Sequence, residues 1–485
     1  MVRPLRLLLI ALLMALLLPA CAQRAKPLPG GDAARGEPVR VVPPASTFCN
    51  PLDLDYRFAL DTPSRRDIAD PVIVRFENEY YLFAARSGGY WHSPDLREWK
   101  LVVPTGLPMD DSSPRVLLLG QIYYSSRDTP ALYTSDDPAT GVWRRATDAE
   151  ASRAARASEL WEQARATRHD GGGFAGRSEA ASTFEDASEQ LWQVAAIGSS
   201  VAGSAERRLG IFPVTRFGWG GEQVDSYLGD YPQFVPGALG SGQQESPGWM
   251  LLSSGKTAAA SSSLADHSPD LGFDENARTW WSAASGGVGE WLSVDLGVIA
   301  RVAALQINFA EQGTQALGRT EDNYHQYIVE SSIDGVHWTT RLDESSTTRD
   351  TPHRYVQLDT ARNARFVRIT NVHAAGGGYF AIRDLRIFGW SPVAAPAAVV
   401  DLSAKRSADE ARATITWRRT ARATAYIVRF GTAGDKLYAS HRVGDIAGVT
   451  LDGLNPAAPY WFVVDAIGEG GIARGRTPVV ARPDT

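Results

Sequence analysis

The chain has 485 residues, of which 44% are hydrophobic and 21% are charged, and its formal net charge at pH 7 is −6. This length exceeds a single hydrophobic core and predicts three or four domains. The acidic balance argues against a nucleic-acid-binding surface, so clusters such as Arg207-Arg208 are expected to be solvated or ion-paired. With only two cysteines, neither a cysteine-based metal site nor a cysteine nucleophile is expected.

Residues 1–21 have the pattern of a processing signal. Arg3 and Arg6 precede an apolar run over 7–18, which is short for a membrane-spanning helix. The segment ends in Leu-Pro-Ala-Cys at 18–21, which resembles the lipobox of bacterial lipoproteins and implies that Cys21 is lipidated. The alternative is a plain secretory peptide that is cut nearby.

The segment after the signal indicates where the protein resides. No acidic retention residue follows Cys21, so the resemblance implies an outer-membrane lipoprotein of the bacterial cell envelope, with the bacterial membrane as a partner through the lipid anchor. Residues 22–47 are rich in Pro, Gly and Ala, which predicts a flexible tether. Cys49 then has no partner and is expected to be a buried thiol.

A four-strand pattern occurs twice after the tether, with a spacing of about 43 residues. The first copy has apolar and aromatic runs near 70–74, 80–83, 90–93 and 99–102. The second copy has them near 113–116, 122–124, 131–135 and 142–144. Four short strands per repeat predict the blades of a β-propeller.

A helical pattern interrupts the third copy. Thr147-Asp148-Ala149-Glu150 is a capping box, and Ala, Glu, Arg and Leu dominate the residues up to Gly171. We therefore expect a helical insert over 147–169 that covers exposed sheet edges, with Leu160 and Trp161 as its anchors. Because a helix cannot replace strands, the propeller is predicted to be shortened.

Residues 48–240 contain several segments that together match one known family. They are Asn50 to Phe58, Ala69-Asp70-Pro71, Tyr80 to Trp99, Gly172-Gly173-Phe174, Ser182-Thr183-Phe184, Glu206 to Pro213 and Gly229-Asp230-Tyr231-Pro232. In these segments the region resembles glycoside hydrolase family 43. That resemblance implies a propeller of the five-bladed type that hydrolyses glycosidic bonds with inversion, generally in plant-type polysaccharides, and it assigns the general base to Asp70.

The general acid that inversion also requires is not apparent in the sequence. In the family it is a Glu in a Glu-Gly-Pro context, which is absent between Trp143 and Gly171. A family His that reaches an ion at the propeller centre is also replaced, since positions 179–181 read Glu-Ala-Ala. Asp70 therefore has a second interpretation, as a turn residue that holds the start of a strand before Pro71. The carboxylates that could restore catalysis are Asp110, Asp111 and Glu179.

A second domain is predicted over 250–390. Its recognisable segments are Phe273 to Asn276, Thr279-Trp280-Trp281, Gly289 to Gly297, Ser332 to Trp338, Ala364 to Ile369 and Leu385 to Gly389. In these segments the domain resembles a discoidin module, also called a coagulation factor 5/8 C-terminal type module, and this implies a jelly-roll β-sandwich whose end loops are free to bind glycans.

Four residues of this module match a structural calcium site that many such modules contain. Asp274, Asn276 and Thr279 match the ion-binding loop, and Asp384 stands where a C-terminal acidic ligand is common. Calcium prefers oxygen ligands of these types. The alternative is a hydrogen-bonded loop without a metal ion.

Sugar binding requires an exposed aromatic face and polar groups for the hydroxyls. Trp281 and Trp291 match core positions of the module, whereas Trp280 would point the other way and is the candidate platform. Gln312, Tyr324 and His325, within 308–327, are candidate polar contacts. The alternative is that this face packs on the propeller.

In the last part of the chain, residues 391–485, Ile415-Thr416-Trp417 would place a buried Trp on a strand, and Tyr426 to Phe430 alternates inward and outward. This region resembles a fibronectin type III module, which implies a β-sandwich spacer without chemistry of its own.

Together these patterns predict an all-β protein: a truncated five-bladed-type β-propeller with a helical insert, a jelly-roll discoidin β-sandwich and a fibronectin type III β-sandwich. The predicted function is that of a catalytically impaired, carbohydrate-associated lipoprotein that binds a glycan or polysaccharide, with calcium as the expected cofactor and no nucleic-acid partner. One alternative is an active inverting glycosidase of the arabinosidase or xylosidase type. Another is a surface module that binds proteins.

Overall fold

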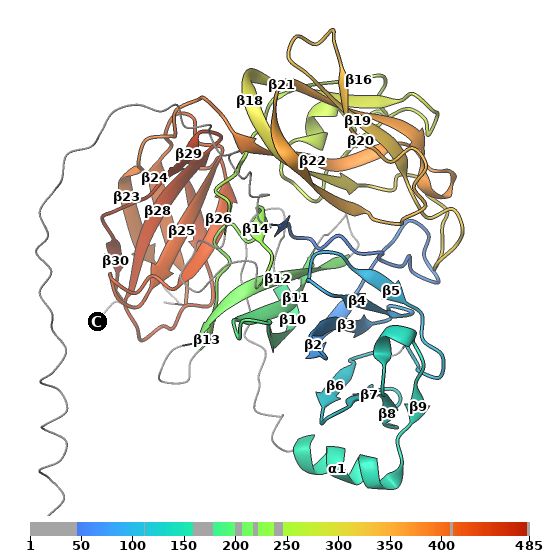
Figure 1. The fold of residues 1–485 in the computed structure, drawn as a ribbon. Helices are drawn as coiled ribbons and strands as arrows, with labels where there is room; N and C mark the ends of the chain where they lie inside the picture. Colours follow the sequence, from blue (N-terminus) through green and yellow to red (C-terminus); the bar gives the residue numbers. More distant parts are fainter. Residues whose placement is uncertain are drawn as a thin grey trace, which may run out of the picture. The chain divides into compact units, whose positions relative to one another are not determined.

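The structure, a computed structural model, describes residues 46–110, 112–158, 178–198, 206–216, 222–236, 246–407 and 411–482. Within these ranges nearly all regular structure is β-strand, and the one α-helix is α1 (Asp148–Ser158) (Figure 1). The predicted β class is thereby confirmed. No helix in the described ranges is long and apolar enough to cross a membrane.

Three four-stranded antiparallel sheets occupy the described part of residues 69–224, and each pairs its strands in chain order. The predicted repeats correspond to the first two sheets, and a third follows α1. No closed sheet joins them in the described ranges, and their assignment to a shortened propeller stays a prediction. The strands are β2 (Ala69–Phe76), β3 (Glu79–Ala85), β4 (Tyr90–Ser93) and β5 (Lys100–Val102); β6 (Arg115–Leu118), β7 (Ile122–Ser125), β8 (Tyr133–Ser135) and β9 (Arg144–Arg145); and β10 (Ser178–Glu185), β11 (Leu191–Gly198), β12 (Arg207–Arg216) and β13 (Glu222–Val224).

Strand β3 shows how these sheets pack. Tyr80 and Leu82 enter one buried cluster together with Trp192 of β11. The alternate residues Tyr81 and Phe83 enter a second cluster, which includes residues of β6 and β7. Successive side chains of a strand point to opposite faces, so the first sheet is covered on both sides.

Helix α1 begins as the capping box predicts. The backbone N–H of Thr147 donates to Glu150 Oε2 at 2.7 Å, and the N–H of Glu150 donates to Thr147 Oγ1 at 3.3 Å. Ala154 is buried in a small cluster with Leu117 and Tyr123, so the helix packs on β6 and β7. The predicted anchors Leu160 and Trp161, and the predicted helix end at 169, lie outside the described residues.

The second module is a β-sandwich built around two long strands, β18 (Trp291–Phe309) and β21 (His353–His373). These strands pair with each other in antiparallel fashion. The register of the pairing shifts twice along β18, between Asp295 and Ala300 and between Val302 and Ala304. Such β-bulges bend a sheet. The other strands are β15 (Met250–Leu251), β16 (Thr257–Ala260), β17 (Trp281–Ser282), β19 (Gln326–Ser332), β20 (Thr339–Asp343) and β22 (Ala381–Trp390).

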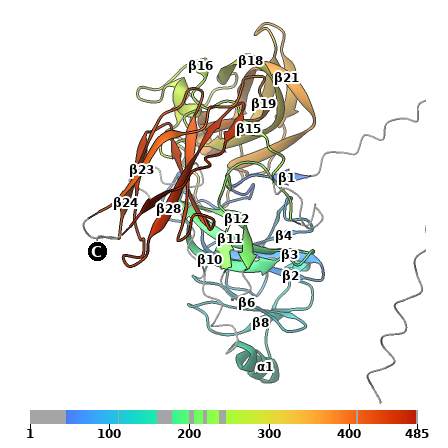
Figure 2. The same ribbon diagram turned by 90° about the vertical axis from the view of Figure 1, so that its left-hand side faces the viewer.

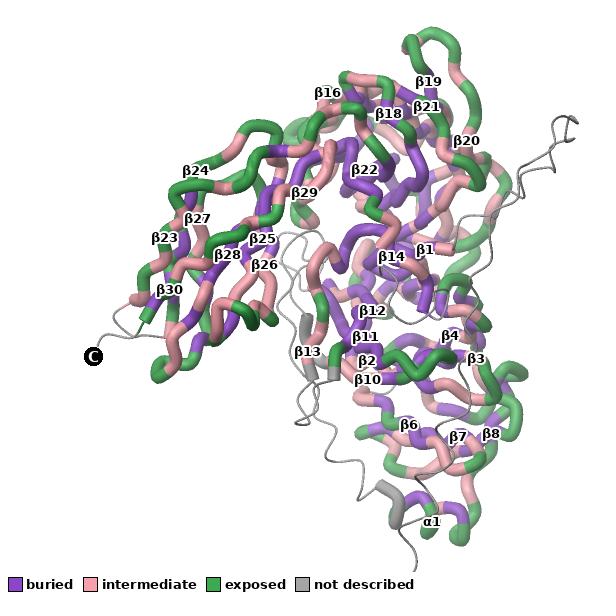
Figure 3. Tube along the Cα trace, turned by 60° about the vertical axis from the view of Figure 1, so that its left-hand side comes forward, coloured by how far each residue is buried: buried purple, intermediate pink, exposed green. Residues whose placement is uncertain are grey.

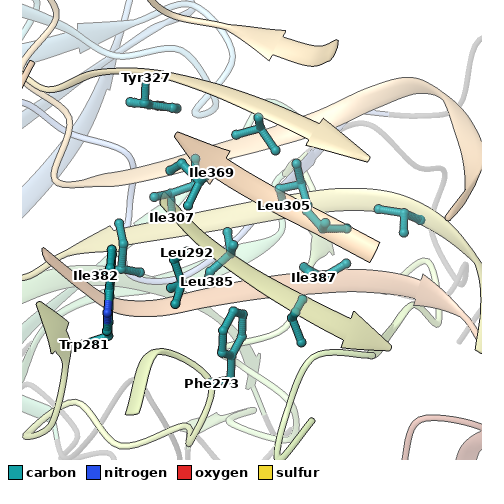
Figure 4. Close-up of a cluster of buried hydrophobic side chains, with 14 of the residues drawn as sticks. Phe273, Trp281, Leu292, Leu305, Ile307, Tyr327, Ile369, Ile382, Leu385 and Ile387 are labelled. Carbon is teal, nitrogen blue, oxygen red and sulfur yellow. The ribbon is translucent and has the colours of Figure 1, made fainter. Parts of the chain in front are cut away.

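The core of this sandwich draws apolar side chains from several strands and from Phe273, which follows the 3-10 turn at 269–272 (Figure 4). Trp281 is fully buried, as predicted for a core position. Trp291 is half-buried, so that part of the expectation is wrong: the first residue of β18 lies at the margin of the core. Labelled members of the core are Phe273, Trp281, Leu292, Leu305, Ile307, Tyr327, Ile369, Ile382, Leu385 and Ile387.

The C-terminal module has a three-stranded and a five-stranded sheet (Figure 2). Trp417 is buried among Ile415, Tyr426 and Phe462, which agrees with its predicted role as a strand Trp in the core. Membership of the fibronectin type III family stays a prediction. The strands are β23 (Val400–Arg406), β24 (Ala413–Arg418) and β27 (Gly448–Leu451), and β25 (Ala425–Gly431), β26 (Ala439–Gly444), β28 (Tyr460–Gly468), β29 (Gly471–Ala473) and β30 (Val479–Ala481).

Strand β22 is buried on both faces along almost its entire length (Figure 3). One face carries the apolar residues of the sandwich core, and the other carries Arg386, which is fully buried. Arg386 Nε and Nη2 donate to the two carboxylate oxygens of Glu275 at 2.8 and 3.0 Å, and Nη2 also donates to Asp230 Oδ2 at 3.1 Å. Arg442 of β26 pairs with the same two carboxylates. We call Asp230, Glu275, Arg386 and Arg442 the four-charge network.

A second buried ionic group joins residues 55–66 to the sandwich. Arg66 is completely buried, and its guanidinium pairs with Glu311 and with Asp350, whose Oδ1 lies 2.7 Å from Nη2. Burial raises the pKa of Asp350 to about 7, although Arg66 acts in the opposite direction. We call Arg66, Glu311 and Asp350 the Arg66 group. Buried charges of this kind require their partners, so the two segments form one folded unit.

Candidate functional site

The first candidate site is a cavity of about 150 Å³ beside Asp70, at the start of β2. Asp70 Oδ2 accepts a hydrogen bond from Ser113 Oγ at 3.0 Å. Asp70 and Ser113 stand at the same position of the two repeats, both precede proline, and both have a left-handed backbone with φ of 49° and 50°. The lining residues are Asp67, Ile68, Ala69, Asp70, Ala85, Arg86, Ser112 and Arg207.

The cavity contains a second carboxylate that sequence reasoning missed. Asp67 is held by Arg207, whose Nε and Nη2 donate to Oδ1 and Oδ2 at 2.9 and 2.7 Å. Burial would raise the pKa of Asp67, but the hydrogen bonds and charge of Arg207 outweigh it and the pKa is lowered. A general acid must hold a proton near neutral pH, so Asp67 is unsuited to that role. The prediction that Arg207 is ion-paired is confirmed.

The other carboxylates that could restore catalysis do not join Asp70. The side chain of Asp110 is 65% exposed and pairs with Arg57 at 2.6 Å. Glu179 contributes its backbone to β10 opposite Ala196, and its side chain is outside the description. Asp111 lies outside the described residues. Among the residues that line the cavity, Asp70 is thus the carboxylate without an arginine partner.

The second candidate site surrounds Trp280 on the β-sandwich. Trp280 is half-buried, and its Nε1 donates to Gln312 Oε1 at 3.1 Å. The His267 ring lies against the indole, with centroids 4.5 Å apart, and its Nδ1 is 3.0 Å from the Trp280 carbonyl oxygen. The Gln312 carbonyl accepts from the backbone of Tyr379, whose side chain is 37% exposed. We call His267, Trp280, Gln312 and Tyr379 the Trp280 cluster.

Gly313 allows the Tyr379 ring to approach the backbone next to Gln312 closely. Its φ is +68°, a conformation that favours glycine, and a Cβ atom there would lie 2.9 Å from the Tyr379 ring. Of the cluster, the sequence indicated Trp280 and Gln312. His267 and Tyr379 are brought in from loops 45 or more residues away from Gln312, without a local signal.

The structure places the other two predicted sugar contacts differently. His325 is buried and stacks on Phe309 at 4.0 Å, and burial, with Arg66 and His373, lowers its pKa to about 3. A sugar in solution cannot reach it in this arrangement. Tyr324 is half-buried with its ring 5.2 Å from that of His373, so it keeps an accessible edge.

The segment that carries these residues packs on residues 55–66. Phe58 N–H donates to the Gly318 carbonyl at 3.2 Å, and Arg319 pairs with Asp55. Much of 311–325 therefore serves an interface, which is the alternative noted for this face.

Three of the four predicted calcium ligands are joined by hydrogen bonds within one loop. Asp274 Oδ1 and Oδ2 accept from the backbone N–H of Asn276 at 3.0 Å and from Thr279 Oγ1 at 2.7 Å. Asp384 Oδ2 accepts from the N–H of Glu275 at 2.9 Å, which attaches the loop to β22. In the described ranges no group of three or more His, Cys, Asp or Glu side chains forms a metal centre, so the set depends on carbonyl, amide and hydroxyl oxygens as well.

The charges of this loop fit a cation. Burial and then the Glu275 carboxylate raise the pKa of Asp384 well above its usual range, and burial also raises that of Asp274. A bound calcium ion would neutralise both groups and tie the loop to β22 through Asp274, Asn276, Thr279 and Asp384. Oxygen donors of this kind suit calcium.

The two cysteines differ. Cys49 is a free, buried thiol whose Sγ lies 3.2 Å from the Asp230 carbonyl oxygen, as the sequence predicted. Cys21 lies outside the described residues.

Comparisons with known proteins concern mainly the second module. Residues 257–385 match the family model F5/8 type C domain, so this part of the chain is an F5/8 type C module. No curated protein matches the chain.

Similar solved structures include sugar-binding modules. Chitosan-binding module 1 of a chitosanase/glucanase from Paenibacillus sp. IK-5 is 27% identical and covers 29% of this chain and 98% of its own, with a TM-score of 0.24. The family 32 carbohydrate-binding module of Clostridium perfringens NanJ, solved with galactose, is 20% identical over 29% of this chain and 98% of its own, with a TM-score of 0.25. A glycoside hydrolase is 15% identical over 68% of this chain and 99% of its own, with a TM-score of 0.33.

Proposed function

We propose that this is a carbohydrate-associated protein of the bacterial cell envelope that binds glycans through the Trp280 cluster of its F5/8 type C module. Residues 48–240 form a shortened family 43-like propeller with impaired catalysis, and residues 391–485 form a fibronectin type III spacer. The observation that carries the proposal is the grouping of two accessible aromatic rings with an amide and an imidazole.

This grouping has the chemistry that a sugar requires. The C–H face of a pyranose ring packs on an aromatic face, and its hydroxyls need donors and acceptors nearby. Trp280 and Tyr379 supply aromatic surface, while Gln312 and His267 supply the polar groups. The hydrogen bond from Trp280 to Gln312 holds the indole in place before a ligand arrives, so less ordering is needed on binding.

We expect Trp280→Ala to weaken glycan binding at least tenfold, because the variant loses the main apolar contact surface, worth on the order of 1.5–3 kcal/mol. A glycan array identifies the ligand, and calorimetry then compares variants; galactose and chitosan oligosaccharides are the first probes. Trp390→Ala and Tyr438→Ala are matched controls, since these side chains are 41% and 38% exposed outside the cluster. Equal losses in the controls, or unchanged binding by Trp280→Ala, would contradict the assignment.

A second function, glycosidic hydrolysis, is supported by one observation, the accessible carboxylate of Asp70 in a cavity. Because the cavity lining offers no carboxyl group suited to be the acid, we expect hydrolysis to be weak and to appear on nitrophenyl glycosides before natural oligosaccharides. A missing acid typically costs about 10²–10⁴-fold. Asp70→Asn should remove any residual rate, with Asp110→Asn as the control. Rapid turnover of an arabinan or xylan fragment that Asp70→Asn abolishes would establish the glycosidase alternative instead.

The proposed location depends on Cys21. We expect Cys21→Ser to release the protein from the membrane fraction or to arrest its processing, because the acyl chains supply the membrane affinity. Fractionation and mass measurement of the mature N-terminus check this, and Cys49→Ser serves as the control thiol. A Cys21→Ser protein that matures normally and stays in the membrane fraction would show that another segment anchors the chain.

A further inference from the structure

The turn at residues 311–314 carries Gln312 of the Trp280 cluster, and we call it the Gln312 turn. Gln312 uses two oxygen atoms within the cluster. Its side-chain oxygen accepts from Trp280 Nε1 at 3.1 Å, and its carbonyl oxygen accepts from the Tyr379 N–H at 2.8 Å. A shift of this turn would therefore disturb the contacts of both aromatic residues.

The backbone of the Gln312 turn requires support from outside. The Thr314 N–H donates to the Glu311 carbonyl oxygen at 3.2 Å, which closes the turn. Glu311 has a φ of 55° and Gly313 has a φ of +68°, so both residues lie in the left-handed region. Glycine adopts this conformation readily, whereas glutamate does so only at a cost in free energy. Such residues persist where the surrounding structure holds them in place.

That support comes from residues 64–66, which precede the first sheet. Arg66 is completely buried and pairs with the carboxylate of Glu311, whose side chain is 2% exposed. The Ser64 hydroxyl donates to the carbonyl oxygen of Thr314. These two contacts hold the first and the last residue of the Gln312 turn. Both supporting side chains belong to a segment that lies outside the F5/8 type C module.

We propose that Ser64 and Arg66 are positioning residues of the Trp280 cluster, so that the sugar-binding site is completed by the region that precedes the module. The identity of the ligand rests on the proposed function, whereas the support of the turn does not. The inference gives residues 55–66 a role that needs no catalysis, because they keep a binding surface in its working arrangement. Coupling between two sites is reciprocal, so a glycan bound at the cluster also strengthens the contact with this segment.

The first test measures glycan affinity in the whole protein, with the ligand that the array identifies. Ser64→Ala removes the donor to Thr314 without changing a charge, and we expect it to weaken binding by about threefold or more, because a hydrogen bond that holds the turn is lost. The matched control is Ser226→Ala, since the Ser226 hydroxyl also joins two regions, through Ser440 Oγ at 2.8 Å. The control should leave the affinity unchanged. Arg66→Met also lowers overall stability and is the less selective variant.

The second test needs no ligand. The Tyr379 amide reports on the Gln312 turn, because its N–H donates to the carbonyl oxygen of Gln312. Hydrogen exchange of the peptide that contains Tyr379 should become faster in Ser64→Ala and remain as in wild type in Ser226→Ala, at a temperature where both variants are folded. A general loss of stability would instead speed exchange throughout the module.

The outcomes separate this inference from the proposed function. Faster exchange at Tyr379 together with weaker glycan binding in Ser64→Ala supports it. Trp280-dependent binding that Ser64→Ala leaves unchanged would overturn it and leave the proposed function standing. Unchanged exchange at Tyr379 would overturn it whatever the protein binds. If the wild-type protein binds no glycan, faster exchange in Ser64→Ala still supports the positioning role, and only the proposed function fails.

Discussion

Asp230→Asn is expected to lower the unfolding temperature of the protein by on the order of 10 °C at neutral pH. The carboxylate of Asp230 accepts hydrogen bonds from both Arg386 and Arg442, and all three side chains are at most 8% exposed. Asparagine has nearly the same shape as aspartate but carries no charge. In the variant, the buried guanidinium groups of Arg386 and Arg442 would share Glu275 as the one remaining carboxylate of the network. Removing one partner of a buried ion pair costs about 3–5 kcal/mol, and each 1 kcal/mol corresponds to roughly 2–4 °C for domains of this size.

The pH dependence of this effect has a definite sign. Burial acts to raise the pKa of Asp230, but Arg442 and Arg386 lower it below its ordinary value. Its contribution to stability is therefore present above the unfolded-state pKa and is lost as the pH falls through the folded-state value. Calorimetry of wild type and Asp230→Asn should show the largest difference near neutral pH and a smaller one in acid.

Asp452→Asn is the control for this prediction. Asp452 belongs to an exposed ion pair with Arg412 at 3.8 Å, and such pairs contribute about 0–1 kcal/mol. A shift of the same small size for Asp230→Asn would mean that the four-charge network does not hold the modules together.

Arg66→Met is expected to destabilise the protein by about 3–5 kcal/mol at pH 8, because it leaves Glu311 and Asp350 buried without their cation. The pKa of Asp350, already raised to about 7 by burial, would rise further once the opposing charge of Arg66 is gone. A carboxyl group with a raised pKa takes up a proton more readily in the folded state, so its cost is smallest in acid, grows as the pH rises above the unfolded-state pKa and levels off above the folded-state pKa, which is higher in the variant. The variant should therefore lose less stability at pH 5 than at pH 8.

The neighbouring Arg65 provides the matched control. Its side chain is 36% exposed and lies 3.9 Å from Asp67, so Arg65→Met should cost less than about 1 kcal/mol at either pH. Adding Asp350→Asn to Arg66→Met should recover part of the lost stability, since one unpaired charge is removed. If Arg66→Met is equally destabilised at pH 5 and pH 8, the two carboxylates are not the cause.

Features with local causes could be predicted from the sequence. The strands of the first two sheets follow a period-two pattern between turn formers, and the capping box at Thr147 fixes where α1 begins. Trp281 and Trp417 occupy buried strand positions for the same reason. The adjacent Trp280 is only half-buried, because neighbouring side chains of an extended segment point to opposite faces.

The ionic groups could not be predicted because their partners are remote in sequence. Arg386 and Asp230 are 156 residues apart, and Arg442 and Asp230 are 212 apart. Nothing near Arg66 or Arg386 distinguishes a buried guanidinium from a solvated one. The same limit affected His325, which was read as a polar contact and is enclosed by Phe309 and by the segment that packs on residues 55–66.

The shared backbone of Asp70 and Ser113 bears on how the cavity beside β2 is interpreted. Both residues adopt the same left-handed turn before a proline, one repeat apart, and touch each other. The same turn in both repeats belongs to the way each repeat begins its first strand, so the left-handed backbone at Asp70 is not by itself evidence of a catalytic role. In the second repeat, Ser113 adopts the same turn without a carboxylate. At this position the first repeat differs from the second by the negative charge of the Asp70 carboxylate. A ligand that binds beside Asp70 in preference to the equivalent position of the second repeat must respond to that charge.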